Sequence, residues 1–285
     1  MGAPNLFTLP PSRSESLQKE YRRDEILENP MIKLKTKEEI EILKEGGKRH
    51  AFILQEVSKK VASGVSTLDL ENYARELIKE GGDVGSLLGY TPRGAKRAYP
   101  AVLCVSVNNQ IVHGIPNENP TILQEGDIVS LDLCLTHKKL ITDATVTVGV
   151  GKIDPKNQKL IDHCREALML GIKTAKGGNH IGDIGYAIES FVRPLGYGIA
   201  EGLAGHGVGY KVHEEPFVPN EGKLGQGEVL RPGMVLAIEP MITLGTGRIV
   251  LSKDGYTYKT ADGSNAAHFE HTVVITDGEP IVLTK

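Results

Sequence analysis

Carboxylates lie inside stretches of this sequence whose apolar pattern otherwise predicts buried β-strands. Asp132 lies in the segment 127–135 and Asp143 in the segment 140–148, both of which alternate in the manner of strands. Aspartate is disfavoured in strands, and a buried carboxylate costs free energy unless another group compensates its charge. No lysine or arginine is interleaved within these two segments. The chain must therefore fold so that the carboxylates meet some other compensating group.

The second half of the chain repeats this arrangement. Glu239 follows the apolar run 234–238 and precedes Pro240, which favours an extended backbone, and Glu270 lies in the strand-like segment 267–276. His206 is flanked by glycines that leave space around its imidazole. Two divalent cations would compensate the four carboxylates, and these oxygen and nitrogen donors suit Mn²⁺, Fe²⁺, Co²⁺ or Zn²⁺. Such metal pairs activate water for hydrolysis.

The polar stretch 136–139 predicts a hairpin between the first two strands. With His137 and Lys138 at the centre of the turn, Asp132 lies directly opposite Asp143, and their Cβ atoms are ~4.5–5.5 Å apart. The turn lacks the favoured Asn-Gly pair, so a slipped register stays open. A bulge that turns one aspartate towards solvent is the alternative.

The order of predicted elements favours an α+β fold, with helices on one side of a largely antiparallel sheet. Capping residues and apolar periodicity predict helices over 36–63, 66–81, 154–174 and 182–195. Strands are predicted over 101–107, 127–135, 140–148, 234–243, 267–276 and 280–284. Segment 64–70 resembles 178–184, and 126–132 resembles 233–239. These matches predict an internal duplication.

Residues 1–31 are expected to form an N-terminal extension, either mobile or wrapped on the surface, and 32–285 to form the folded domain. The three cysteines, Cys104, Cys134 and Cys164, contain no CxxC pair, which excludes a disulfide framework and a thiolate zinc site. The net charge of -3 gives no reason to expect a nucleic-acid partner.

Several classes of site are excluded by their missing motifs. The chain has no GxxxxGK[ST] loop, no GxSxG elbow and no HExxH pair, and 202–209 is not a dinucleotide-binding loop. No apolar stretch approaches the ~18–20 residues that span a bilayer, and no signal peptide precedes the domain. We therefore expect a cytoplasmic protein without a membrane partner.

Seven short motifs occur in one order along the chain. They are CVSVNNQIVHGIP (104–116), GDIVSLD (126–132), DAT (143–145), GHGVG (205–209), HEEP (213–216), IEPM (238–241) and FEHT (269–272). Together they resemble the type 1 methionine aminopeptidases, metallopeptidases with the pita-bread fold, over residues 32–285. The resemblance implies a pseudo-twofold pair of helix-helix-strand halves.

The resemblance also implies a dinuclear metal site with the same five ligands. Asp143 and Glu270 would bridge the two metal ions, Asp132 would bind one ion, and His206 and Glu239 would bind the other. The ions would be cobalt, manganese, iron, zinc or nickel. A bridging hydroxide would attack the first peptide bond, with Glu239 as proton shuttle.

Further residues match positions that contact the substrate in this family. His113 and His213 match two histidines that contact the scissile amide and stabilise the tetrahedral intermediate. Tyr90, Tyr99 and Cys104 match positions that line the methionine pocket, where sulfur and aromatic rings suit a thioether.

The chain also departs from the family pattern around this pocket. Tyr256 stands where tryptophan is frequent, Val212 where phenylalanine is, and His268 where glutamine is. The segment 92–97 (PRGAKR) includes a short basic insertion. These changes affect pocket size and relative rate rather than the chemistry.

The function implied is removal of the initiator methionine from nascent proteins with a small second residue. The substrate would be a peptide N-terminus, the enzyme a monomer, and the ribosome a candidate partner. An aminopeptidase P or prolidase-type enzyme is one alternative, but those usually carry a substantial N-terminal domain, for which 31 residues are too few. A metal-free binding module of the same fold is another, although such relatives lose ligands and this chain keeps all five.

Overall fold

The computed structural model describes residues 32–92 and 94–285. The prediction of an N-terminal arm over 1–31 lies outside the described residues, as does Arg93 of the basic insertion. None of the helices in the described ranges combines the length and the apolar character needed to cross a membrane.

Within residues 32–92 and 94–285, four α-helices form where the caps and the apolar periodicity predict them. They are α2 (Lys37–Lys59), α3 (Thr67–Gly81), α4 (Pro155–Thr174) and α5 (Ile181–Val192). Capping boxes begin the first two: Thr36 pairs with Glu39, and Ser66 with Asp69. The predicted helix 182–195 ends earlier, because its last turn is the 3₁₀ helix η1 (Arg193–Leu195), which contains a proline.

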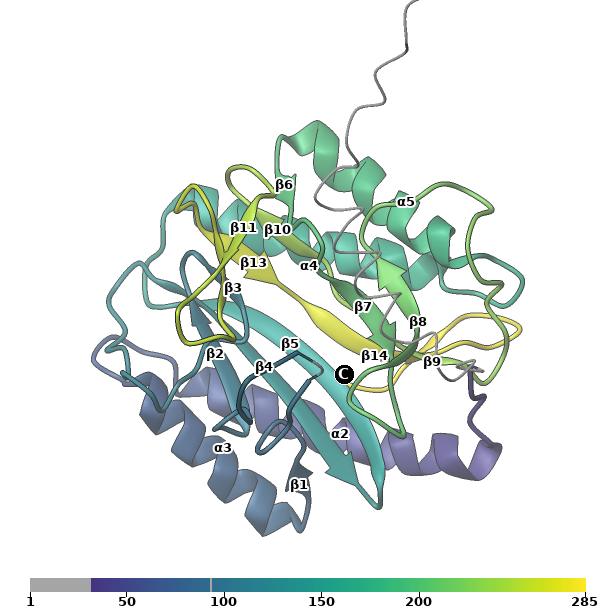
Figure 1. Ribbon diagram of the computed structural model, residues 1–285, viewed down its shortest axis with the longest axis horizontal. Coiled ribbons are helices and arrows are strands. Elements are labelled where there is room, and N and C mark those ends of the chain that lie inside the picture. The colour runs from purple at the N-terminus through teal and green to yellow at the C-terminus, as the bar shows by residue number, and fades with distance from the viewer. Residues whose placement is uncertain (1–31, 93) are drawn as a thin grey trace, which may run out of the picture. The chain divides into compact units, whose positions relative to one another are not determined.

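A nine-stranded antiparallel sheet forms the centre of the domain (Figure 1). Its main path runs β1 (Val84–Gly85), β4 (Ile128–His137), β5 (Leu140–Gly149), β14 (Glu270–Val274), β9 (Val235–Ile238), β7 (Ala204–Gly207) and β8 (Glu214–Pro219). β2 (Leu103–Val107) pairs with β4, and β15 (Ile281–Val282) pairs with β14. The α+β prediction is confirmed.

Two three-stranded sheets complete the fold. One contains β13 (Ala266–His268), β10 (Met241–Thr243) and β6 (Gly198–Ile199). The other contains β11 (Ile249–Leu251), β12 (Tyr258–Thr260) and β3 (Gln110–Val112).

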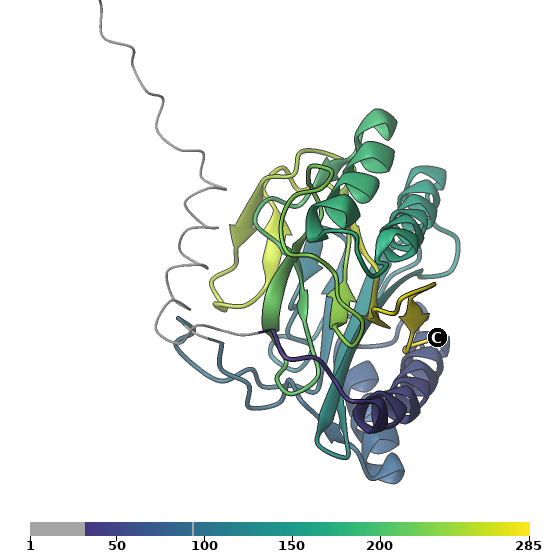
Figure 2. The same ribbon diagram turned by 90° about the vertical axis from the view of Figure 1, so that its right-hand side faces the viewer.

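The helices cover one face of the large sheet (Figure 2). Leu70 of α3 and Val57 of α2 pack with Leu131 of β4 in one core cluster. Leu168 of α4 and Leu236 of β9 belong to a second cluster. Each half of the sheet therefore has its own helix pair and core, which leaves the opposite face available for polar side chains.

The predicted register of the β4–β5 hairpin is wrong, because the turn is centred one residue later in the chain than predicted. Lys138 and Lys139, with φ of 47° and 72°, occupy the turn, so Asp132 lies opposite Thr145 and Asp143 lies opposite Cys134. Two-residue hairpin turns with positive φ match the twist of the strands. Because the pairing shifts by two residues, both aspartates stay on the same face of the sheet.

Two of the predicted strands are each interrupted in the middle. The segment 234–243 divides into β9 and β10 at Glu239-Pro240, and 267–276 divides into β13 and β14 at Phe269. β9 and β14 pair in the large sheet, whereas β10 and β13 pair in a smaller one. Glu239 and Glu270 therefore lie at the point where paired segments pass from one sheet to another.

Candidate metal centre

The five predicted ligands lie on, or directly after, five neighbouring strands of the large sheet. The strands run in the order β4, β5, β14, β9 and β7; Asp132, Asp143, Glu270 and His206 lie within β4, β5, β14 and β7, and Glu239 directly follows β9. All five are buried, with between 2% and 9% of their surface exposed. The sheet thus brings together side chains that are more than a hundred residues apart.

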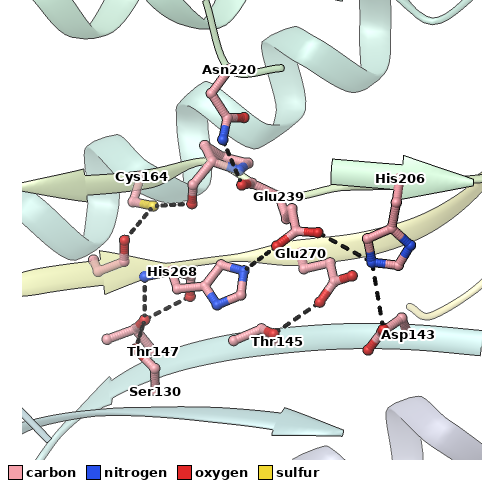
Figure 3. A network of polar contacts seen from close by, with 12 residues as sticks. Ser130, Asp143, Thr145, Thr147, Cys164, His206, Asn220, Glu239, His268 and Glu270 are labelled. Carbon is pink, nitrogen blue, oxygen red and sulfur yellow. Dashed lines mark hydrogen bonds and ion pairs between the residues drawn. The ribbon is translucent and has the colours of Figure 1, made fainter. Parts of the chain in front are cut away.

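The side chains of Asp143, His206, Glu239 and Glu270 converge (Figure 3). His206 Nε2 lies 3.3 Å from Glu239 Oε1 and 3.8 Å from Asp143 Oδ2. Asp143, His206 and Glu270 each offer a ligand atom, and these atoms lie within 4.8 Å of one another. Imidazole nitrogen and carboxylate oxygen are ligands of Zn²⁺-like ions, so these three residues form a candidate group for a divalent ion.

Burial raises the pKa of all four carboxyl groups. The pKa of Glu239 rises to about 8, and those of Asp143 and Glu270 lie well above their usual range, raised further by neighbouring carboxylates. The buried atoms Asp143 Oδ1 and Glu270 Oε1 have no hydrogen-bond partner in the described part of the chain. These features fit a cation site, because a bound cation would offset the repulsion between the carboxylates and would give the unpaired oxygens a partner.

Uncharged donors orient two of these carboxylates. Cys134 Sγ donates to Asp143 Oδ2 at 2.7 Å, and Thr145 Oγ1 donates to Glu270 Oε2 at 2.9 Å. Such outer partners fix the direction of metal-binding groups. Neither Cys134 nor Thr145 is among the predicted site residues, although their position on the same hairpin face as Asp132 was a usable signal.

Glycines flank His206 because β7 approaches its neighbours closely. A Cβ atom at Gly205 would clash with the backbone oxygen of Ala237, and one at Gly207 with that of Glu215. The glycines on either side of His206 therefore allow β7 to pack closely against the adjacent strands while the imidazole reaches the site.

His213 and His113, the two predicted non-ligand histidines, are both neutral. The His213 ring lies 4.4 Å from that of His206 and accepts or donates a 2.8 Å hydrogen bond between Nδ1 and the Tyr90 hydroxyl. Burial lowers the pKa of His113 to about 4 and that of His213 well below its usual value. Neutral imidazoles can each donate one N–H near a reacting carbonyl.

Most residues of the predicted methionine pocket belong to one hydrophobic cluster. Tyr99, Cys104, Val212 and Tyr256 are buried there, and Tyr90 packs against them. The Tyr99 and Tyr256 rings meet edge to face at 5.2 Å. Cys104 lies opposite Asp132, so this cluster adjoins the carboxylates.

A buried ion pair stabilises the loop that carries His213. Lys35 Nζ lies 2.6 Å from Glu214 Oε2, and the two side chains are 2% and 11% exposed. The other oxygen of Glu214 accepts hydrogen bonds from the backbone N–H groups of Lys211 and Tyr210. Glu214 therefore connects the segment before α2 to the backbone that immediately precedes Val212.

We expect Lys35→Met to destabilise the protein by about 3 kcal/mol, because it leaves Glu214 buried without its counter-charge. Urea unfolding of the two proteins measures this difference. Lys44→Met removes an exposed lysine that pairs with Glu41 on α2, and it should change stability little. Equal effects of the two substitutions would contradict a specific contribution from the buried pair.

The antiparallel sheet with its buried carboxylate and histidine group defines a metallopeptidase, and the chain belongs to metallopeptidase family M24, whose model matches residues 41–277. Within that family it is similar to methionine aminopeptidases. The methionine aminopeptidase of Aquifex aeolicus is 43% identical over 256 residues, which cover 89% of this chain and 99% of the relative. Methionine aminopeptidase 1 of Mycobacterium tuberculosis is 40% identical, with 86% and 92% covered. The family predicted from the motifs is confirmed.

Solved structures give the same result. The crystal structure of methionine aminopeptidase from Thermotoga maritima superposes with a TM-score of 0.85 at 41% identity, covering 90% of this chain and all of that one. The prolidase from Pyrococcus furiosus gives a TM-score of 0.69 at 21% identity, with 74% of its length covered. The prolidase shares the fold.

Proposed function

We propose that this protein is a methionine aminopeptidase that removes the initiator methionine from proteins with a small second residue. The observation that carries the proposal is the buried group of Asp143, His206 and Glu270 in a chain that spans nearly the full length of its methionine aminopeptidase relatives. Its identity with those relatives is about twice that with the prolidase named above.

We assign two divalent ions to the site, held by Asp132, Asp143, His206, Glu239 and Glu270. When bound, such ions supply water activation at neutral pH and polarise the scissile carbonyl. Glu239, which lies beside His206, is placed to accept a proton during the attack and to return it to the leaving amine.

His213 and His113 donate hydrogen bonds to the substrate in this proposal. Burial keeps both imidazoles neutral, so each has one N–H for the carbonyl oxygen as negative charge develops on it. The Tyr90 hydroxyl at His213 Nδ1 fixes the ring, which leaves Nε2 for the substrate.

Replacing Tyr90 with phenylalanine should lower kcat/KM about 3–10-fold, because a hydrogen bond that orients a catalytic group contributes about 0.5–1.5 kcal/mol. Steady-state release of methionine from Met-Ala-Ser measures the effect. Tyr197→Phe, which removes a hydroxyl bonded to His163 away from the site, is the matched control. A Tyr90→Phe enzyme with unchanged kcat/KM would contradict the assigned contact.

The function is tested with the purified protein and two tripeptides. With Mn²⁺ or Co²⁺ we expect release of methionine from Met-Ala-Ser and no cleavage of Ala-Pro-Ala. Cleavage of Ala-Pro-Ala alone would indicate a prolidase-like enzyme. No cleavage of either peptide with any divalent metal, together with no metal binding, would indicate a binding module. The cytoplasmic location, the monomeric state and the ribosome as a partner stay predictions.

A further inference from the structure

A second buried imidazole faces the predicted ligand Glu239. His268 lies on β13, two residues before Glu270, and is 2% exposed. Its ring points towards Glu239 (Figure 3), and its Nε2 lies 3.4 Å from Glu239 Oε2. The opposite oxygen, Oε1, faces His206. The Glu239 carboxylate therefore lies between two imidazoles, one at each oxygen.

The backbone of His268 is fixed by a single threonine. The His268 N–H donates to Thr147 Oγ1 at 3.0 Å, and that hydroxyl donates to the His268 carbonyl at 2.7 Å. β13 also pairs with β10, where Met241 lies opposite His268. Because both backbone groups are held, the fold sets the position from which the His268 side chain reaches Glu239.

Glu239 differs from the other carboxylates of the site in its surroundings. Asp143 has the Cys134 thiol as a neutral donor, and Glu270 has the Thr145 hydroxyl. Within the described residues, no hydroxyl or thiol donates to the Glu239 carboxylate, and both ring nitrogens of His268 are buried without a hydrogen-bond partner. The His268 ring thus has a nitrogen available to donate a hydrogen bond, and it lies next to a Glu239 oxygen that no hydroxyl or thiol orients.

We propose that His268 is a positioning residue for Glu239: its Nε2–H directs Oε2, so that Oε1 stays turned towards His206 and the metal ions. The present separation is slightly longer than a strong hydrogen bond, and such contacts commonly shorten when a site is loaded. This inference rests on the proposed metal site but not on the identity of the substrate.

The test compares two replacements of similar size. His268→Gln keeps an N–H donor, whereas His268→Leu removes it. Binding of Mn²⁺ alone to the metal-free proteins is measured by titration calorimetry, without any peptide. We expect His268→Leu to weaken Mn²⁺ binding about 10–100-fold, the usual effect of losing an outer-shell partner. His268→Gln should bind within about threefold of the natural protein. Methionine release should follow the same order, with kcat changed more than KM.

Controls separate this role from simple packing. His163→Leu replaces a histidine on α4 that contacts Tyr197 and Phe191 instead of the site, and it should leave Mn²⁺ affinity unchanged. The melting temperature of each metal-free variant reports whether it folds. Unchanged Mn²⁺ affinity in a folded His268→Leu protein would overturn the proposal, as would a His268→Gln protein that binds as weakly as the leucine variant. Failure of the tripeptide assay alone would affect only the proposed function.

Discussion

Replacing Asp143 with asparagine is expected to abolish methionine release and, at the same time, to raise the melting temperature of the metal-free protein. Asp143 is buried, lies with His206 and Glu270 in the group that can hold a metal, and has one oxygen without a partner in the described chain. Loss of a ligand weakens metal binding and removes several kcal/mol of the transition-state stabilisation that the metal ions supply. Activity should therefore fall by about three orders of magnitude or more.

The expected rise in the melting temperature of the metal-free Asp143→Asn protein follows from the negative charge that the substitution removes. Burial and the neighbouring Asp132 raise the pKa of Asp143 well above its usual range, so its charge opposes folding when no cation is bound. The amide has nearly the same shape and no charge. For a chain of this size each kcal/mol gained raises the melting temperature by about 2–4 °C.

Asp162→Asn is the matched control for this experiment. Asp162 lies exposed on α4 beside Arg165, and its replacement should change neither activity nor melting temperature. Calorimetry in EDTA and a tripeptide assay with Mn²⁺ provide the two measurements. An active Asp143→Asn enzyme would contradict the ligand assignment, and a metal-free variant that melts lower than the natural protein would contradict the electrostatic argument.

For the metal-free protein, the free energy of unfolding should also fall as pH rises from about 7.5 to about 9. Glu239 has a pKa of about 8 in the fold against an ordinary value of 4.5. Its protonated form therefore stabilises the metal-free fold fully below pH 4.5, and this contribution is lost as pH rises through 8. Across the window from pH 7.5 to 9 the loss for this one group is about 1 kcal/mol.

The chosen window isolates the carboxylates from the buried histidines. Lowered pKa values, of about 4 at His113 and His268, add stability as pH rises until the unfolded chain has lost its histidine protons, about one pH unit above their ordinary pKa of 6.5. Melting curves at several pH values in EDTA measure the trend, and curves with saturating Mn²⁺ provide the comparison. A melting temperature that stays flat or rises in EDTA over this window would show that the carboxylates are not destabilising when metal-free.

The sequence was sufficient to place the predicted ligands on the sheet but insufficient to give their exact pairing. A side-chain period of two puts Asp132 and Asp143 on one face whichever even shift the hairpin adopts. The exact register depends on Lys138 and Lys139, which both take positive φ. Lysine has no special preference for that conformation, so tertiary packing rather than local chemistry selects the turn.

Short strands, and the carboxylate that each cross-strand donor meets, could not be predicted from the sequence for a similar reason. β7 is four residues with two glycines, and it exists because it pairs with β8 and β9. Thr145 donates its hydrogen bond to Glu270 because β14 brings that residue opposite to it. Such contacts depend on strands that are distant in the chain, and no local pattern encodes them.

The joint between the two halves of the large sheet is narrow. β5 and β14 meet through only two residue pairs, Thr145 with Glu270 and Ala144 with His271, and the predicted ligands lie on both sides of this joint. Cations bound there would act as a clamp that fastens one half of the molecule to the other. Amide hydrogen exchange along β5 and β14 should therefore slow when Mn²⁺ is added. The same binding step would then both load the site with metal and hold the two halves of the sheet together.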